Sequence, residues 1–461
     1  MLTIMRRSNC VFALLVMGGL VLSISPACAA DIVDAQALSP LEMPPVADIA
    51  PTNYDSMRPK GWIVGLPGPA DMVDQYLGLG GFRSKLANEG IYYFGFSTNS
   101  FADNENPSAN RGGTQLYNGQ KTTLSTQNLF GITYDLSRFG IPDGQFLIWG
   151  AKYAYTWQPG GPSKFGLAGA TYYQTLFNKK VEFKIGYLDS SLEFVGTNVG
   201  GSLSTSVFGP LGSIPYQGGE NNVTTPTPGV IVKYNFDQNF YTKATIQRAV
   251  SPDGFVTEVG ENPSGFDWRT ANTGVLYLDE TGYQRAAAPG VMQTWVRAGA
   301  AYNTSRYTSL ETPGTRTGGN SWYYFLVDRQ LWQIDGRAGS GRRGVYGGFS
   351  VMYAPPNLNR FTQYYELRLY GQGLLDSRPD DLVSLVATST AWSPVAIENA
   401  EAAGSLVHRT SQSITATYSA HIAKGVYGSL GLSLVNHPTT ITYTPATRSA
   451  VNLLGALNIF F

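Results

Sequence analysis

Charged side chains occupy every second position in two segments of the chain. Lys180, Glu182 and Lys184 are separated by apolar residues, and Glu366 and Arg368 are separated in the same way. Because alternate side chains of a β-strand point to the same side, each set would share one face of a strand. A face that mixes both signs of charge creates little net field for one type of ion. It does offer donors and acceptors that can replace water around the hydroxyl groups of a neutral solute such as a sugar.

Five further residues follow the same pattern. Lys233, Lys243 and Arg297 stand opposite apolar neighbours, and Trp295 and Tyr364 fall on the charged faces of their own segments. An aromatic ring at such a position can cover the apolar face of a sugar. We therefore predict that these residues line a path for the solute. The alternative is that they form hydrogen-bonded pairs that only stiffen the sheet.

Catalytic chemistry has little support in the sequence. The glycine-rich stretch 339–344 matches a dinucleotide-binding pattern, but no helix is expected after it, so we predict a turn. A pairing of Ser411 or Ser413 with His421 would suit an outer-membrane lipid hydrolase, which is a lower-ranked alternative. We predict no enzymatic activity, no metal and no cofactor.

The alternating pattern continues from residue 91 to the end of the chain and predicts about sixteen strands of roughly ten to thirteen residues. An eleven-residue strand tilted by about 45° spans roughly 25 Å, which is the height of the apolar band of an outer-membrane barrel. A basic side chain facing lipid at the midplane costs about 2–4 kcal/mol, so the charged faces are assigned to the interior. The sequence therefore predicts an all-β, transmembrane, closed antiparallel barrel over residues 91–461. The strands are expected to start near residues 91, 121, 145, 168, 180, 229, 239, 272, 291, 320, 345, 361, 381, 410, 426 and 449.

The rival fold is a soluble β-sandwich with the same faces reversed, so that the apolar side is buried and the charges are in water. So many long strands would need two or more domains joined by linkers, and no such linker follows residue 60. Connection lengths also favour the barrel, which has short turns on one rim and long loops on the other. Short turns are predicted at 178–179, 237–238 and 423–425, and long connections at 102–120, 189–228, 249–271, 304–319 and 393–409.

The N-terminal residues have the pattern of a secretory signal peptide. Arg6 and Arg7 precede the uncharged run 11–22, and small residues follow, which predicts cleavage near Ala30. The two cysteines of the chain, Cys10 and Cys28, both lie in this part, so we predict a mature chain without disulfides. Three segments are expected before the barrel: a signal peptide (1–30), a Pro-rich arm (31–60) and a short periplasmic, plug-like segment with a helix (61–90).

The last twelve residues predict an amphipathic strand. Its apolar face carries Val451, Leu453, Leu457, Ile459 and Phe461, and its wetter face carries Asn452, Ala456 and Asn458. A chain that ends on an aromatic residue of such a strand resembles the closing strand of bacterial outer-membrane barrels. We expect the barrel-assembly machinery to recognise it.

Composition agrees with this class. Charged residues make up only 14% of the chain, and glycine is abundant at 53 residues. Removing Arg6 and Arg7 leaves 30 basic against 32 acidic residues, a formal charge of −2. A charge this close to balance gives no support for nucleic-acid binding.

Four passages of the chain resemble the carbohydrate-selective porins of the OprB family, and the resemblance extends from about residue 77 to 461. It implies a sixteen-stranded channel in the bacterial outer membrane for glucose and similar sugars, with a constriction lined by charged residues. The implied partners are monosaccharides or small oligosaccharides and outer-membrane lipid, with a monomeric or trimeric assembly. A general diffusion porin for small hydrophilic solutes and ions is the main alternative. The four passages are Leu86–Ile91, Tyr134–Phe146, Lys184–Asp189 and Gly344–Phe349.

The connection from Asp189 to Thr227 is too long for a plain loop, and long loops are usually functional or disordered. It is the third connection on the outer rim, and in porins generally that connection folds inward and narrows the pore. We therefore predict that it brings five side chains into the channel: Glu193, Phe194, Phe208, Tyr216 and Glu220.

Overall fold

The computed structural model describes residues 57–62, 72–73, 82–106, 112–157, 161–195, 213–222, 224–334 and 340–461. Every described residue belongs to one compact unit. The predicted signal peptide, its cleavage position near Ala30 and the arm up to residue 56 lie outside the described residues. No helix among the described residues is long and apolar enough to cross a membrane.

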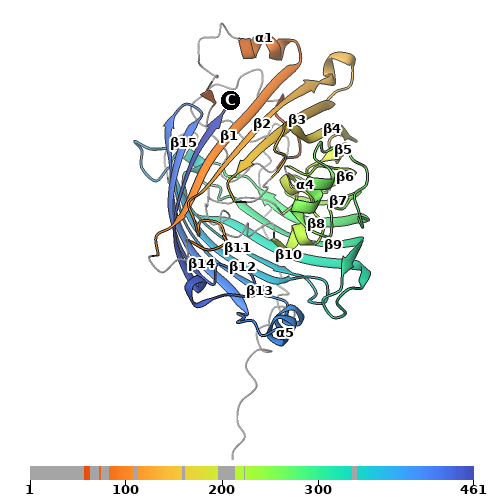
Figure 1. Cartoon of the computed structure of the whole chain (residues 1–461). Helices are drawn as coiled ribbons and strands as arrows, with labels where there is room; N and C mark the ends of the chain where they lie inside the picture. Colours follow the sequence, from red (N-terminus) through yellow and green to blue (C-terminus); the bar gives the residue numbers. More distant parts are fainter. Residues whose placement is uncertain are drawn as a thin grey trace, which may run out of the picture. The chain divides into compact units, whose positions relative to one another are not determined.

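Sixteen antiparallel strands of the described chain close into one barrel, drawn in Figure 1. Each strand pairs with its sequence neighbours, and β1 also pairs with β16, so the sheet has no free edge. This confirms the predicted fold class. The strands are β1 (Ile91–Asn104), β2 (Thr123–Asp135), β3 (Gln145–Tyr155), β4 (Gly166–Leu176), β5 (Val181–Leu188), β6 (Thr227–Asn235), β7 (Phe240–Arg248), β8 (Val275–Arg285), β9 (Thr294–Thr308), β10 (Arg316–Gln333), β11 (Gly344–Tyr353), β12 (Phe361–Gln372), β13 (Leu382–Trp392), β14 (Thr410–Ala423), β15 (Val426–Asn436) and β16 (Ser449–Phe460).

The end of the chain completes the barrel. Phe461 and Gly95 exchange two backbone hydrogen bonds, with N–O distances of 2.7 and 3.0 Å. A Cβ at position 95 would lie 2.4 Å from the Phe461 ring, so the terminal aromatic side chain crosses β1 where only a glycine leaves room for it. In β16 itself, Leu453 and Leu457 are exposed whereas Asn452 is fully buried, as the alternation predicted.

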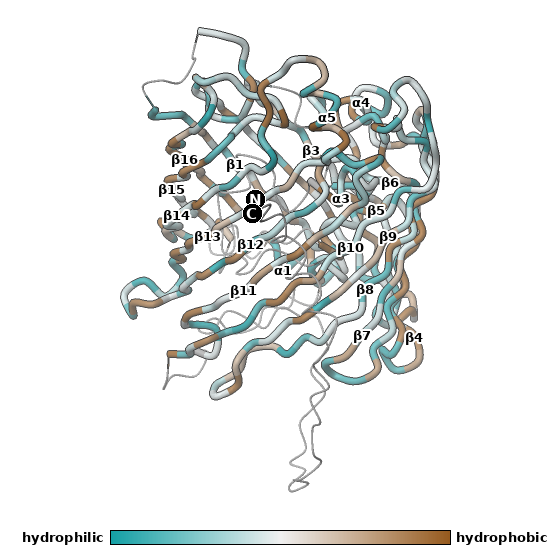
Figure 2. Tube along the Cα trace, turned by 90° about the horizontal axis from the view of Figure 1, so that it is seen from below, coloured by the Kyte–Doolittle hydropathy of each residue, from teal (hydrophilic) through white to brown (hydrophobic). Residues whose placement is uncertain are grey.

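The two faces of the sheet differ in polarity. Figure 2 shows hydrophobic and hydrophilic residues alternating along β13 to β16. The outward-facing Leu367 and Leu430 are 66% and 63% exposed, whereas Lys184, Arg297 and Arg368 are 3%, 1% and 2% exposed. A soluble sandwich would reverse these values, with charges in water and leucines in the core. The exposures therefore exclude the sandwich and place the charges inside the barrel.

The connections agree with the prediction of short turns on one rim and long loops on the other, with one error. Residues 177–180, 236–239 and 424–425 form tight turns at one end, which we call the short-turn rim. The predicted long connection at 304–319 is wrong, because β9 and β10 extend into it and leave only residues 309–315 between them. A register shift between Gly318 and Asn320 breaks the alternation there, so the sequence pattern hides the start of β10.

Few helices accompany the strands in the described residues. Figure 1 shows α1 and α5 at opposite ends of the barrel. The short helix expected before the barrel is α1, although most of residues 61–81 lie outside the described part of the chain. The helices are α1 (Phe82–Asn88), α3 (Ser213–Gln217), α4 (Phe255–Glu261) and α5 (Pro394–Ala402), and the 3-10 turns are η3 (Leu136–Phe139), η4 (Ser190–Leu192), η5 (Ser340–Arg342) and η6 (Pro445–Thr447).

Candidate channel constriction

The strand register places four charged residues side by side across β5 to β8. Glu182 pairs with Lys233, Lys233 with Lys243, and Lys243 with Glu280. Their exposed fractions are 7%, 8%, 7% and 0% in that order. Two lysines directly opposite each other repel, and the glutamates at the two ends of the row offset this repulsion. We call these four residues the charge ladder.

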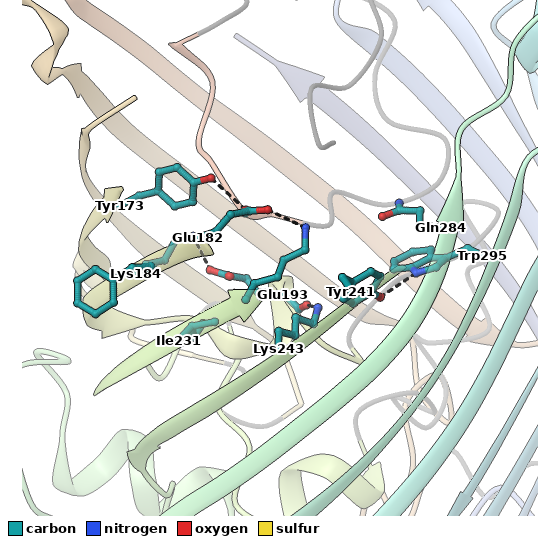
Figure 3. Close-up of a pocket in the computed structure, with 12 residues that line it drawn as sticks. Tyr173, Glu182, Lys184, Glu193, Ile231, Tyr241, Lys243, Gln284 and Trp295 are labelled. Carbon is teal, nitrogen blue, oxygen red and sulfur yellow. Dashed lines mark hydrogen bonds and ion pairs between the residues drawn. The ribbon is translucent and has the colours of Figure 1, made fainter. Parts of the chain in front are cut away.

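Glu182 forms the first end of the ladder and is fully hydrogen-bonded. Its Oε1 accepts bonds from Lys233 Nζ at 2.9 Å and from Asn235 Nδ2 at 2.8 Å. Its Oε2 accepts a bond from the Tyr173 hydroxyl at 3.0 Å. Figure 3 shows the Tyr173 hydroxyl directed toward Glu182. Such a carboxylate contributes its charge to the lumen without leaving an unsatisfied oxygen.

Glu280 forms the other end of the ladder and contacts two cationic side chains and two tyrosine hydroxyl groups. It pairs with Lys243 at 2.9 Å and lies 3.7 Å from Arg297. Its oxygens also accept hydrogen bonds from the hydroxyl groups of Tyr241, at 2.8 Å, and Tyr324, at 2.7 Å. Sequence reasoning missed this residue. Glu280 shares its face of β8 with the apolar Leu276 and Leu278, and Asp279 lies on the opposite face, so the alternation of polar and apolar residues did not mark this face as the lumen side.

The predicted aromatic residue Trp295 lies next to the ladder, together with Arg297. The guanidinium carbon of Arg297 stands 3.7 Å from the centre of the Trp295 ring, which is a close cation–π contact. The indole nitrogen donates to the Tyr241 hydroxyl at 3.1 Å. Arg297 thus covers one face of the Trp295 indole. This contact and the hydrogen bond from Trp295 to Tyr241 fix the position of the Arg297 guanidinium beside the ladder.

The connection after β5 folds into the lumen, as predicted. Glu193 pairs with Lys184 through its carboxylate, and its backbone carbonyl accepts a bond from Lys243. Arg297 donates to the carbonyl of Phe194. A buried apolar cluster inside the barrel anchors the described parts of this connection against the wall, and it includes Phe194, Val195, Ile214, Leu276, Leu278, Leu326, Met352 and Tyr364. Of the other predicted residues, Glu220 is fully buried, Tyr216 is half-buried, and Phe208 lies outside the described residues.

Two carboxyl groups of this connection, those of Asp189 and Glu220, have pKa values raised by burial. Burial raises the pKa of Asp189 to about 7, although a hydrogen bond from Ser191 opposes the rise. Burial also raises the pKa of Glu220 well above its ordinary value, and the nearby carboxylates of Asp189 and Glu280 add to the effect. One oxygen of Asp189 and one of Glu220 have no hydrogen-bond partner. Burial therefore favours the neutral forms of Asp189 and Glu220 over their charged forms.

A cavity opens beside the ladder (Figure 3). Glu182, Lys233 and Lys243 line it, together with Gly61, Tyr173, Lys184, Glu193, Tyr241, Gln284 and Trp295. Its lining combines carboxylates, ammonium groups, hydroxyl groups and an amide with aromatic rings. This mixture can donate to and accept from a neutral solute while leaving little net field.

Three of the predicted residues form a separate cluster on β10 to β12. Arg368 Nε and Nη2 bind both oxygens of Asp328 at 2.7 Å, and Nη1 binds Glu366 at 3.0 Å and Ser350 at 2.7 Å. Tyr364 donates to Glu366. Every nitrogen of the guanidinium is engaged, so Arg368 holds three strands together. Tyr364, Glu366 and Arg368 are buried, but the sequence did not separate them from the charge ladder, and it missed Asp328.

The remaining predicted positions lie elsewhere. Lys180 is exposed in the turn at the short-turn rim, apart from Lys184 and Glu182. Ser411 and Ser413 lie on the same strand as His421, β14, at roughly 33 and 26 Å from it at about 3.3 Å per residue, so both hydrolase pairings are wrong. The stretch 339–344 leads through the short turn η5 into β11, so its described part is not a strand-to-helix nucleotide motif. In the described part of the chain, no group of three or more His, Cys, Asp or Glu residues is arranged to hold a metal.

A closed antiparallel barrel with an apolar outside and a polar lumen narrowed by an inward connection defines a channel of the porin class. The sequence matches the family model of the carbohydrate-selective porins, OprB family, over residues 83–438. The chain therefore belongs to this family. The family and the barrel together imply a location in the bacterial outer membrane.

Solved structures share the fold. The high-pH structure of Pseudomonas putida OprB superposes with a TM-score of 0.67 at 15% sequence identity, covering 83% of this chain and 97% of that one. The low-pH structure of the same protein gives a TM-score of 0.54 at 14% identity, covering 85% and 99% of the two chains. A search of curated protein sequences found no match.

Proposed function

We propose that this protein is a channel for the passive diffusion of glucose and similar sugars across the outer membrane. The charge ladder supports the proposal, because three of its residues, Glu182, Lys233 and Lys243, line the cavity and its opposite charges compensate each other over short distances. Compensated charges attract no single ion strongly, whereas their hydrogen-bonding groups can exchange with the water around sugar hydroxyls. Binding of this kind is weak enough to let the sugar leave.

Lipid vesicles that contain the purified protein test this proposal. We expect vesicles to swell faster in glucose than in sodium gluconate of equal osmolarity, because gluconate has nearly the same size but carries a negative charge. Swelling is followed by light scattering, with protein-free vesicles as the control. Equal rates for the two solutes would contradict carbohydrate selectivity and indicate a general diffusion porin.

The route to the membrane is also proposed from the sequence. We propose that residues 1–30 are removed as a signal peptide near Ala30 and that the barrel-assembly machinery recognises β16. The exposed apolar side chains of β16 and the terminal Phe461 support this recognition. Outward-facing leucines such as Leu367 and Leu430 would then contact outer-membrane lipid.

A further inference from the structure

Residues Met57–Trp62, which we call the strap, lie inside the barrel against β2 and β3. The buried Gln145 side chain donates to the carbonyl oxygens of the first two strap residues at 2.9 and 3.0 Å. Its own oxygen accepts a bond from the backbone nitrogen of Lys60 at 3.0 Å. Thr133 adds a fourth bond, from its hydroxyl to the first strap carbonyl, at 2.6 Å. Two uncharged side chains of the wall therefore hold the strap by its backbone.

An aromatic contact fixes the far end of the strap. The Trp62 ring lies 5.4 Å from that of Phe94 and 4.9 Å from that of Trp149, measured between centroids. It also packs against the buried Leu129 and Leu147. These are lumen-facing residues of β1, β2 and β3, so the strap occupies space inside the barrel that solute would otherwise cross.

Lys184 links the strap to the inward connection. Its ammonium group donates to the carbonyl of Lys60 at 2.6 Å and pairs at the same time with Glu193. Gly61 makes this approach possible, because a Cβ there would lie 2.9 Å from Lys184 Nζ and 3.0 Å from a Glu193 oxygen. The φ angle of Gly61 is +81°, which also favours glycine. The strap and the connection thus meet at one ammonium group beside the cavity.

We propose that the strap is the second wall of the constriction and sets the largest sugar that passes. The inference rests on the proposed function, since it assigns the size limit of the same pore. Residues of the charge ladder and of the inward connection line the cavity, and so does Gly61 of the strap. Loosening the strap would widen the passage without removing any charge from the ladder.

The double variant Thr133→Val, Gln145→Leu tests this assignment, because it removes the four hydrogen bonds that Thr133 and Gln145 make with the strap and changes no charge. We expect the ratio of the swelling rate in raffinose, a trisaccharide, to that in glucose to rise about twofold or more, since permeation depends steeply on pore width. Gly61→Ala is a second variant in the strap itself, and we expect it to raise the ratio in the same direction. Thr415→Val is the matched control, because Thr415 is buried on β14 and bonds Ser433.

Folding of each variant is checked by its altered mobility in gels before and after heating. An unchanged raffinose-to-glucose ratio in both folded strap variants would overturn the assignment. An equal rise in Thr415→Val would also overturn it, because the effect would then follow from any loss of lumen hydroxyls. Failure of the proposed function is a separate result: the wild type would show no preference for glucose over gluconate, whatever the strap variants do.

Discussion

The Glu280→Gln variant is expected to conduct anions in preference to cations, whereas the wild type discriminates weakly. The substitution removes the carboxylate that lies 2.9 Å from Lys243 and 3.7 Å from Arg297. The positive charges of both side chains then lose the negative charge of Glu280. Two unit charges about 4 Å apart interact by roughly 4 kcal/mol at an effective dielectric constant of 20. Even a third of that energy would change the anion-to-cation permeability ratio about tenfold, because each 1.4 kcal/mol is a factor of ten. The reversal potential of planar bilayers under a potassium chloride gradient measures this ratio.

Asp279→Asn provides the control, because Asp279 precedes Glu280 in β8 and is exposed on the outward face. It makes the same change in charge without altering the lumen. Glutamine at position 280 keeps an oxygen that can accept from Tyr241 or Tyr324, so the barrel should still assemble. A reversal potential that moves equally in both variants would show that the ladder does not control ion passage.

We expect the main effect of the Arg368→Ala substitution to be a loss of barrel stability and not a change in solute selectivity. Arg368 is 2% exposed and binds Asp328 with two bonds and Glu366 with one. Breaking a buried ion pair by removing one partner costs about 3–5 kcal/mol, because the other charge remains buried and unpaired. The free energy of unfolding, measured by denaturant titration of the reconstituted barrel, should fall by this amount.

Arg316→Ala serves as the comparison. Its ion pair with Asp253 is 2.7 Å long, but both side chains are about 30% exposed, so its loss should cost less than about 1 kcal/mol. Adding Asp328→Asn to Arg368→Ala should restore part of the lost stability, because it removes a stranded carboxylate. Equal stability of Arg368→Ala and the wild type would contradict the structural role of this cluster.

Alternation along each strand predicted most of the fold. It located β1, β3, β12, β14, β15 and β16 at their observed first residues. It failed at β10, where a register shift near Gly318 breaks the period. The alternation could not predict the strand register, because the alignment of one strand with the next depends on turn geometry and packing.

The site was predicted only in part, because alternation describes one strand at a time. The sequence identified Glu182, Lys233, Lys243, Trp295 and Arg297 as lumen residues, but periodicity within one strand does not show which residues meet across strands. Glu280 was therefore missed although it completes the ladder, and Arg368 was not separated from it. The strap was harder to predict, because its contacts with Gln145 and Lys184 span 85 and 124 positions in the sequence.

The central claim is that a neutral sugar enters the space beside the charge ladder and displaces water and ions there. The ionic current through single channels, recorded as glucose is added, measures this directly. We predict that the current falls with glucose concentration and reaches a plateau, as expected for a site that fills. A current that falls only in proportion to the conductivity of the bulk solution, at every glucose concentration, would contradict the account.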